Sequence, residues 1–210
     1  LKELEQKLSE ANANCKEVAG RLTATRRKAA TTVERGMKDR LVPLGIPKVR
    51  FSISIEPREF QRDGCDAVAF LFSANSSSDM MPISQVASGG EIARVMLSLK
   101  AMISNAVKLP TIIFDEIDTG VSGKIAEKMA LIMQEMAQSE RQVISITHLP
   151  QIAARGTTHY KVYKEETENG TESTMTRLND EQRVNEIAQM LSGSDITDAA
   201  KHNAKDLLGA

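Results

Sequence analysis

The sequence contains few of the residues that several common binding functions require. Only 3% of its 210 residues are aromatic and none is tryptophan, which argues against a surface that stacks the bases of single-stranded nucleic acid. The formal net charge is -1, so contact with DNA has to come from a local basic patch or from parts of a protein beyond this chain. Cys15 and Cys65 lack the spacing of metal-ligand or redox motifs.

Long apolar runs are missing as well. No run approaches the roughly 18 residues of a membrane-spanning helix, and no signal-peptide pattern is present. We therefore expect a soluble protein of the cytoplasm, associated with the nucleoid if its partner is DNA. The length is enough for one sizeable hydrophobic core, or for a domain with an appendage.

The chain begins inside a heptad pattern. Apolar, small and polar residues alternate spacings of three and four at Leu1, Leu4, Leu8, Ala11, Cys15, Val18, Leu22, Thr25, Ala29 and Thr32. Glycines and prolines from Gly36 to Pro47 predict that the helix ends near Arg40. We expect residues 1–40 to be a stub of a longer coiled coil that needs a partner strand, followed by a lobe over residues 41–210. A single amphipathic helix packed on that lobe is the alternative.

The period changes after the helix. Residues 49–55 alternate apolar and polar and predict a half-buried strand, and residues 66–72 predict a second, more buried strand. The turn between them is expected at residues 61–64, and a loop at 75–79.

A helix start with two glycines follows. Ser88 is a natural N-cap, and Glu91, three residues on, completes a capping box. Capping alone does not explain Gly89 and Gly90, because glycine is a poor helix former. Paired glycines leave backbone N–H groups uncovered at the positive end of a helix, which is what close approach to a phosphate requires.

The central feature is an apolar run that ends in two carboxylates. Thr111 to Phe114 show no polar alternation and predict a buried parallel strand. Asp115 and Glu116 then fall at its C-terminal edge, where open α/β sheets bind ligands. A phosphate-bound Mg²⁺ fits there, since it takes one or two carboxylates plus waters and phosphate oxygens. The alternative is an acidic N-cap for the next helix.

A second strand ends in a histidine. Residues 142–147 predict another buried strand, and His148 follows it at the same sheet edge, where it can donate to a phosphate or satisfy a loop carbonyl. Helices are expected at 122–139 and 149–155. A hairpin around Asn169 and Gly170, a helix capped by Asp180 and a last helix ending near Leu208 carry no assignable chemistry.

In this order and spacing, the motifs resemble the C-terminal half of an ABC-type ATPase head. Residues 87–91 match the signature motif, 111–116 the Walker B strand, 117–120 the D-loop, and His148 the switch histidine. Within that class, the blocks at 86–100, 114–123 and 146–153 resemble the RecN family of bacterial DNA repair proteins, relatives of the SMC proteins. One departure is Ala87, where the general signature motif has leucine.

The resemblance implies a role for each motif. Asp115 would hold Mg²⁺, Glu116 would orient the attacking water, and His148 would reach the γ-phosphate of ATP. In the signature motif, the residues that would bind ATP held by a partner head are Ser88, Gly89, Gly90 and Glu91. In the D-loop, Asp118 would also contribute to nucleotide binding.

The resemblance also implies the setting of the reaction. ATP would be sandwiched between two heads of a homodimer that acts on DNA double-strand breaks. The implied fold is the C-terminal half of an ABC-type head, a mixed, mainly parallel sheet flanked by helices, preceded by a long coiled-coil helix.

A P-loop is missing. The pair Gly123-Lys124 is followed by Ile125 instead of serine or threonine, and Asp118 stands in place of the first glycine. The P-loop half of the same protein is thus an expected partner, and this chain alone is expected to be inactive. Two alternatives stay open, namely a head fragment of another SMC-like or ABC ATPase, including a transporter, and a non-catalytic ABC-like dimerisation module.

Overall fold

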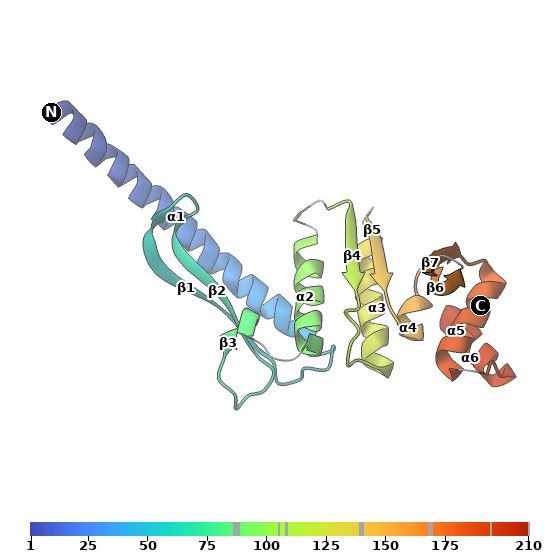
Figure 1. The fold of residues 1–210 in the computed structure, drawn as a ribbon. Coiled ribbons are helices and arrows are strands. Elements are labelled where there is room, and N and C mark those ends of the chain that lie inside the picture. Colours follow the sequence, from blue (N-terminus) through green and yellow to red (C-terminus); the bar gives the residue numbers. More distant parts are fainter. Residues whose placement is uncertain are drawn as a thin grey trace. The chain divides into compact units, whose positions relative to one another are not determined.

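The computed structural model describes residues 1–85, 89–104, 106–107, 109–138, 141–167, 170–193 and 195–209, and only the backbone of Thr167. The chain forms two compact units, Leu1–Ser98 and Leu99–Ala210, which are treated separately (Figure 1). Within the described ranges, no helix is both long and apolar enough to cross a lipid bilayer.

The first unit combines one long helix with a small antiparallel sheet of order β1-β2-β3. Its elements are α1 (Lys2–Leu41), β1 (Arg50–Gln61), β2 (Gly64–Ser73), β3 (Met81–Pro82), the 3-10 turn η1 (Ile83–Gln85) and the start of α2 (Gly89–Ser104). The helix, the two strands and the turn between them are confirmed where the sequence predicts them. Both strands are longer than predicted, and they form an antiparallel hairpin that lies along α1 (Figure 1).

The two halves of α1 differ in burial. In the later half Ala30, Met37 and Leu41 are buried, as is Ala19 just before it, whereas Leu1, Leu4 and Leu8 are 94%, 70% and 63% exposed. The alternative of a helix packed on the lobe therefore accounts only for the later half. The leucines of the early half have no covering among the described residues, and the coiled coil that would cover them stays a prediction.

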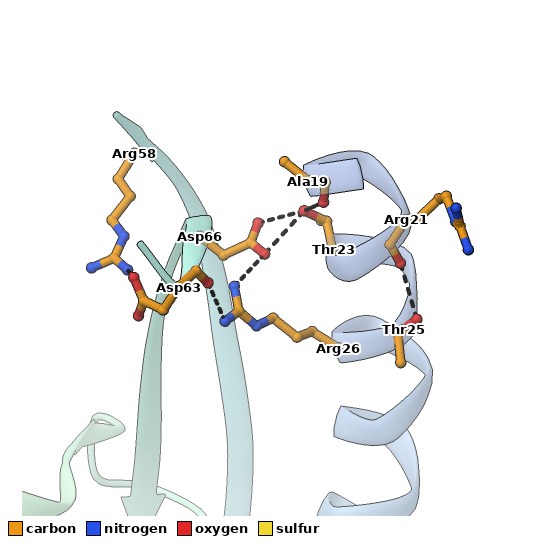
Figure 2. Close-up of polar contacts among 8 residues, drawn as sticks. All are labelled: Ala19, Arg21, Thr23, Thr25, Arg26, Arg58, Asp63 and Asp66. Carbon is orange, nitrogen blue, oxygen red and sulfur yellow. Dashed lines mark hydrogen bonds and ion pairs between the residues drawn. The ribbon is translucent and has the colours of Figure 1, made fainter. Parts of the chain in front are cut away.

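A polar cluster fastens the hairpin turn to α1 (Figure 2). Asp66 on β2 is only 4% exposed, and the Thr23 hydroxyl lies 2.8 and 2.9 Å from its two carboxylate oxygens. Arg26 donates to the same carboxylate at 2.9 Å and to the Asp63 carbonyl at 2.6 Å. The hydrogen bond from Arg26, and then that from Thr23, lowers the pKa of Asp66. The cluster therefore couples the direction of the helix to the hairpin.

We expect Arg26→Met to loosen this attachment, because it leaves the buried Asp66 carboxylate without its cationic partner. In the full-length protein, amide hydrogen exchange over residues 60–68 should accelerate. Arg58→Gln is the matched control, since Arg58 pairs with the 68% exposed side chain of Asp63 and an exposed ion pair contributes little. Equal exchange rates in the two variants would contradict a structural role for the Asp66 cluster.

The same cluster predicts a pH dependence. A lowered folded-state pKa of Asp66 means that its stabilising contribution is present above the unfolded pKa of about 4 and is lost as the pH falls through the folded value. Protection of the hairpin-turn amides, measured as exchange relative to the intrinsic rate at each pH, should therefore fall on acidification below about pH 4, and less so in Asp66→Asn. Acid sensitivity that is identical in that variant would assign the effect to other carboxylates.

The second unit carries a parallel strand pair and an antiparallel hairpin. Its elements are β4 (Thr111–Asp115), α3 (Gly123–Ala137), β5 (Gln142–Ile146), α4 (Pro150–Ala153), β6 (Tyr160–Thr167), β7 (Gly170–Arg177), α5 (Asp180–Ser192) and α6 (Asp198–Leu208). The α/β class is confirmed. Among the described strands only β4 and β5 pair in parallel, so the parallel share is smaller than "mainly parallel" predicts.

The prediction that β4 is buried on both faces is wrong. Ile112 and Phe114 are buried, but Ile113 is 56% exposed. On β5, Ile144 pairs with Ile113 and is 40% exposed, and Ile146 is 51% exposed. The described residues cover only one face of this strand pair. The isoleucines on the other face form an exposed apolar surface.

Helices supply most of the core of the second unit. On α3 the buried residues are mainly methionines and alanines, and the helix lies against β5. The α5–α6 pair packs on Ala154 through Ile187, Ala188, Ala200 and Ala204. The predicted cap Asp180 is wrong, because the neighbouring Asn179 caps α5 in a capping box with Gln182. Ser122 precedes α3 as predicted but makes no side-chain cap hydrogen bond.

Candidate functional site

The carboxylates and the histidine come together because β4 and β5 are parallel neighbours. Asp115, the last residue of β4, pairs with Ile146, the last residue of β5. Both strands therefore end at the same edge, and Asp115, Glu116 and His148 all follow that edge as the sequence predicts. The side chains of all three are exposed there, which leaves them free to meet a ligand.

Glu116 has an unusual backbone conformation. Its φ is +46°, the only positive φ of a non-glycine residue among those described, a conformation that costs such residues roughly 1–2 kcal/mol. Its N–H donates to the Ile146 carbonyl at 3.1 Å, and the Thr119 hydroxyl donates to its carbonyl at 3.0 Å. These bonds turn the chain sharply after β4 and hold the Glu116 backbone in place. Backbone strain of this kind clusters at functional sites.

Asp118 is buried beneath this turn. Its side chain is 1% exposed, and Thr147 donates a short hydrogen bond to Oδ2. Oδ1 has no hydrogen-bond partner among the described residues, and it lies 3.6 Å from Nδ1 of His148. That distance is too long for a hydrogen bond, but it allows an ion pair once the imidazole is protonated. The Asp118 carboxylate is therefore a buried group that lies beside the exposed imidazole of His148 without a hydrogen bond to it.

Thr147 is the residue that the motif analysis missed. Besides binding Asp118, its hydroxyl accepts a hydrogen bond from the N–H of Leu149 at 2.9 Å, and so fixes the backbone on both sides of His148. The signal was present in the sequence as the threonine directly before the histidine. Its significance depends on the position of Asp118, which the sequence alone does not give.

The described part of the signature motif, residues 89–91, begins α2. Ser88 lies outside the described residues, so its capping role stays a prediction. Gly89 and Gly90 form the first turn of α2, with Glu91 next to them in the same turn. A Cβ added at Gly89 would meet no atom within 4 Å. Local packing therefore does not require glycine at this position, although glycine costs about 1 kcal/mol relative to alanine inside a helix.

The acidic residues fit part of a metal-nucleotide site. Within the described ranges, no cluster of three or more His, Cys, Asp or Glu side chains could hold a metal ion by itself. An exposed carboxylate such as Asp115 suits Mg²⁺, because this ion usually takes one or two carboxylates and completes its shell with water and phosphate oxygens. The donor set thus matches a magnesium ion that arrives with a nucleotide.

Solved structures with a similar fold belong to the SMC proteins. The Smc head domain with coiled coil and joint from Pyrococcus yayanosii matches 80% of this chain and 30% of its own, with a TM-score of 0.61 at 20% identity. A chain from a study of ATP-driven dimerisation and DNA-stimulated activation of SMC ATPases matches 82% of this chain and 99% of its own, with a TM-score of 0.55 at 17% identity. The fold is therefore that of an SMC-type ATPase head.

Sequence comparison narrows the class further. The chain is 35% identical to DNA repair protein RecN of Halalkalibacterium halodurans over 213 residues, which is 99% of this chain and 38% of that protein. It is 39% identical to RecN of Rickettsia conorii over 91% of this chain and 35% of that protein. No protein-family model matches. The chain belongs to the RecN family, and it spans about a third of the length of these curated relatives.

Proposed function

We propose that this chain is one lobe of an ATPase head in a RecN-type DNA repair protein. In the complete protein, ATP binding and hydrolysis would bring two heads together on DNA at double-strand breaks. The observation that carries the proposal is the convergence of Asp115, Glu116, Asp118 and His148 at one edge of a parallel strand pair. Family membership supports the DNA repair setting.

Each residue at the edge has a distinct task in this proposal. Asp115 would hold the magnesium ion that accompanies the nucleotide, and this ion would supply positive charge against the phosphates. Glu116 accepts a hydrogen bond from the attacking water and orients it. His148 donates to the terminal phosphate, while Thr147, bonded to the buried Asp118, fixes the backbone beside it. The task of these groups is positioning and charge stabilisation, as expected for phosphoryl transfer.

The signature segment serves the second head. Gly89 and Gly90 expose backbone N–H groups at the N-terminus of α2, and such groups bind phosphate oxygens. We assign Ser88, Gly89, Gly90 and Glu91 to the nucleotide bound by the partner head. Dimerisation would then depend on ATP, because the nucleotide contributes part of the interface.

The P-loop must come from the remainder of the protein. This chain has no P-loop motif, and the relatives are much longer than the chain. The P-loop half would hold the β- and γ-phosphates against Asp115 and would cover the exposed face at Ile113, Ile144 and Ile146. Magnesium and ATP would therefore be held by residues from both halves of one head.

A non-catalytic dimerisation module is the competing function. Such a module needs the apolar surfaces and the signature segment, but it has no use for the strained Glu116 backbone or for the buried Asp118 carboxylate near His148. Both features carry a free-energy cost. Their presence together favours an ATPase.

The experiment that tests the proposal is Gly89→Asp in the full-length protein. The aspartate places a negative charge where the partner's phosphate has to approach, so we expect loss of ATP-induced dimerisation and a drop in ATP turnover of about 100-fold. Binding of a fluorescent ATP analogue to single heads should persist, because each P-loop is intact. Size-exclusion chromatography with light scattering measures the dimer.

Gly89→Ala controls for folding. A Cβ at this position has free space, and alanine favours the helix by about 1 kcal/mol, so this variant should melt no lower than the parent. If Gly89→Asp still dimerises with ATP like the parent, the signature assignment is wrong.

A further inference from the structure

One face of α1 carries cationic side chains that form no ion pair with the described residues. Five exposed side chains make no ion pair and no side-chain hydrogen bond with any residue in the described part of the chain. They are Arg21, Arg27, Lys28, Arg35 and Lys38, and we call them the cation face. By contrast, Arg26 on the same helix is bound to Asp66.

The helical spacing gathers these residues on one side. Arg21, Lys28, Arg35 and Lys38 follow one another at intervals of seven, seven and three residues, and Arg27 lies beside Lys28. At about 100° per residue, they fall within a sector of roughly 120°. From Arg21 to Lys38 the sector runs for about 25 Å along the helix. Figure 2 shows Arg21 directed away from the hairpin.

The cation face differs from the two other faces of α1. One of these packs on the hairpin, and the other continues the apolar seam of the heptad pattern. Each is centred roughly 120° around the helix from the cation face. The face on the hairpin consists of Ala19, Thr23, Arg26, Ala30 and Met37. The seam consists of Val18, Leu22, Thr25, Ala29 and Thr32. Arg21, Lys28 and Arg35 flank the apolar seam, so a partner strand on the seam would run beside them and leave their charged ends at the edge of that interface.

Charge is distributed unevenly along the helix. Residues 16–40 contain eight Lys or Arg and three Asp or Glu, a net charge of +5, whereas residues 1–15 contain two and three, a net charge of -1. Glu34 is not available to neutralise the cation face, since it accepts from the Ile53 N–H on β1 at 2.7 Å. Glu17 and Asp39 are exposed near its two ends. The local excess contrasts with the net charge of -1 for the whole chain.

We propose that the cation face of α1 binds the phosphate backbone of duplex DNA. The Arg and Lys residues form a row along the helix, with no acidic residue between Arg21 and Arg27 or between Arg35 and Lys38. Such a row suits the regularly spaced phosphates of duplex DNA. Contacts to phosphates carry no sequence information. The sector contains no aromatic residue, so it lacks a platform for stacking single-stranded bases. The proposal rests on the proposed function, because it locates the DNA contact of that protein.

The test compares three variants of the full-length protein by fluorescence anisotropy with a short labelled duplex. In the first, Arg21, Lys28, Arg35 and Lys38 are all changed to Gln. We expect about 100-fold weaker binding at moderate salt and a slope of log K against log salt that is less steep by about 3 to 4. Affinity for a labelled oligo(dT) single strand should fall less than affinity for the duplex.

Two further variants serve as controls. Changing each of the four residues to the other basic type, Arg to Lys and Lys to Arg, keeps the charge and should keep most of the duplex affinity. Changing Lys164, Arg177, Lys201 and Lys205 to Gln removes four exposed cations elsewhere and should leave the affinity and the salt slope near those of the parent. Thermal melts of all variants check folding.

The outcomes separate the two proposals. If the parent binds duplex and the first variant binds it equally well with the same salt slope, the cation face is not the contact and the proposed function stands. Equal loss in the charge-retaining variant would also overturn the inference, since it would point to altered structure. If the parent binds no duplex at all, the proposed function fails and the inference fails with it.

Discussion

Glu116→Gln in the full-length protein is expected to lower ATP turnover by at least about 100-fold while leaving ATP binding intact. Glutamine has nearly the shape of glutamate, but its amide cannot accept a proton and orients water less well. ATP-bound dimers should therefore accumulate, because hydrolysis is what allows the heads to separate in the proposed cycle. Single-turnover phosphate release and light scattering measure the two effects.

The conformation of Glu116 makes this substitution informative. The residue sits at φ +46° and its N–H is bonded to the Ile146 carbonyl, so the backbone fixes the start of the side chain independently of its charge. Glutamine tolerates this φ about as well as glutamate does, since neither is β-branched. The expected loss of turnover thus reports on the carboxylate itself.

Glu127→Gln is the matched control for Glu116→Gln. Glu127 is an exposed residue of α3 that contacts Arg155 at 3.4 Å, and its removal should leave turnover unchanged within about a factor of two. Near-parental turnover in Glu116→Gln would show that another group orients the water.

The sequence predicted the elements well where local signals were strong. The long helix, the β1–β2 hairpin, the two strands that end at the candidate site and the paired strands β6 and β7 occur where periodicity and turn residues place them. Errors arose where tertiary context decides. An unbroken apolar run at β4 looks the same whether one face or both are covered, and here Ile113 remains exposed.

The candidate site shows the same division. Asp115, Glu116 and His148 could be placed at one edge because parallel strands end together. The positive φ of Glu116 and the burial of Asp118 against Thr147 could not be predicted, since they depend on hydrogen bonds that the residues after β4 make with the end of β5 and with Thr147. On α1, spacing alone indicates a basic sector, but only the contacts of Arg26 and Glu34 show which charged residues the hairpin already uses.

The 210-residue chain by itself should release no phosphate from ATP above background. Asp115 and Glu116 provide a metal ligand and a water-orienting group, but nothing in the sequence supplies the backbone cradle and lysine that hold the β- and γ-phosphates. The exposed isoleucines Ile113, Ile144 and Ile146 should also make the isolated chain self-associate, because apolar side chains that cluster on one face of a strand pair seek cover.

Co-expression with the P-loop half of the protein should reverse both properties. We expect ATP turnover only in the mixture, together with a change from self-associated chain to a defined complex of the two halves in light scattering. Ile113→Thr with Ile144→Thr should reduce self-association of the isolated chain, since threonine keeps the β-branched shape and removes apolar surface. Turnover by the isolated chain at the rate of the mixture would mean that the nucleotide binds elsewhere, because the P-loop half would then add nothing to Asp115 and Glu116.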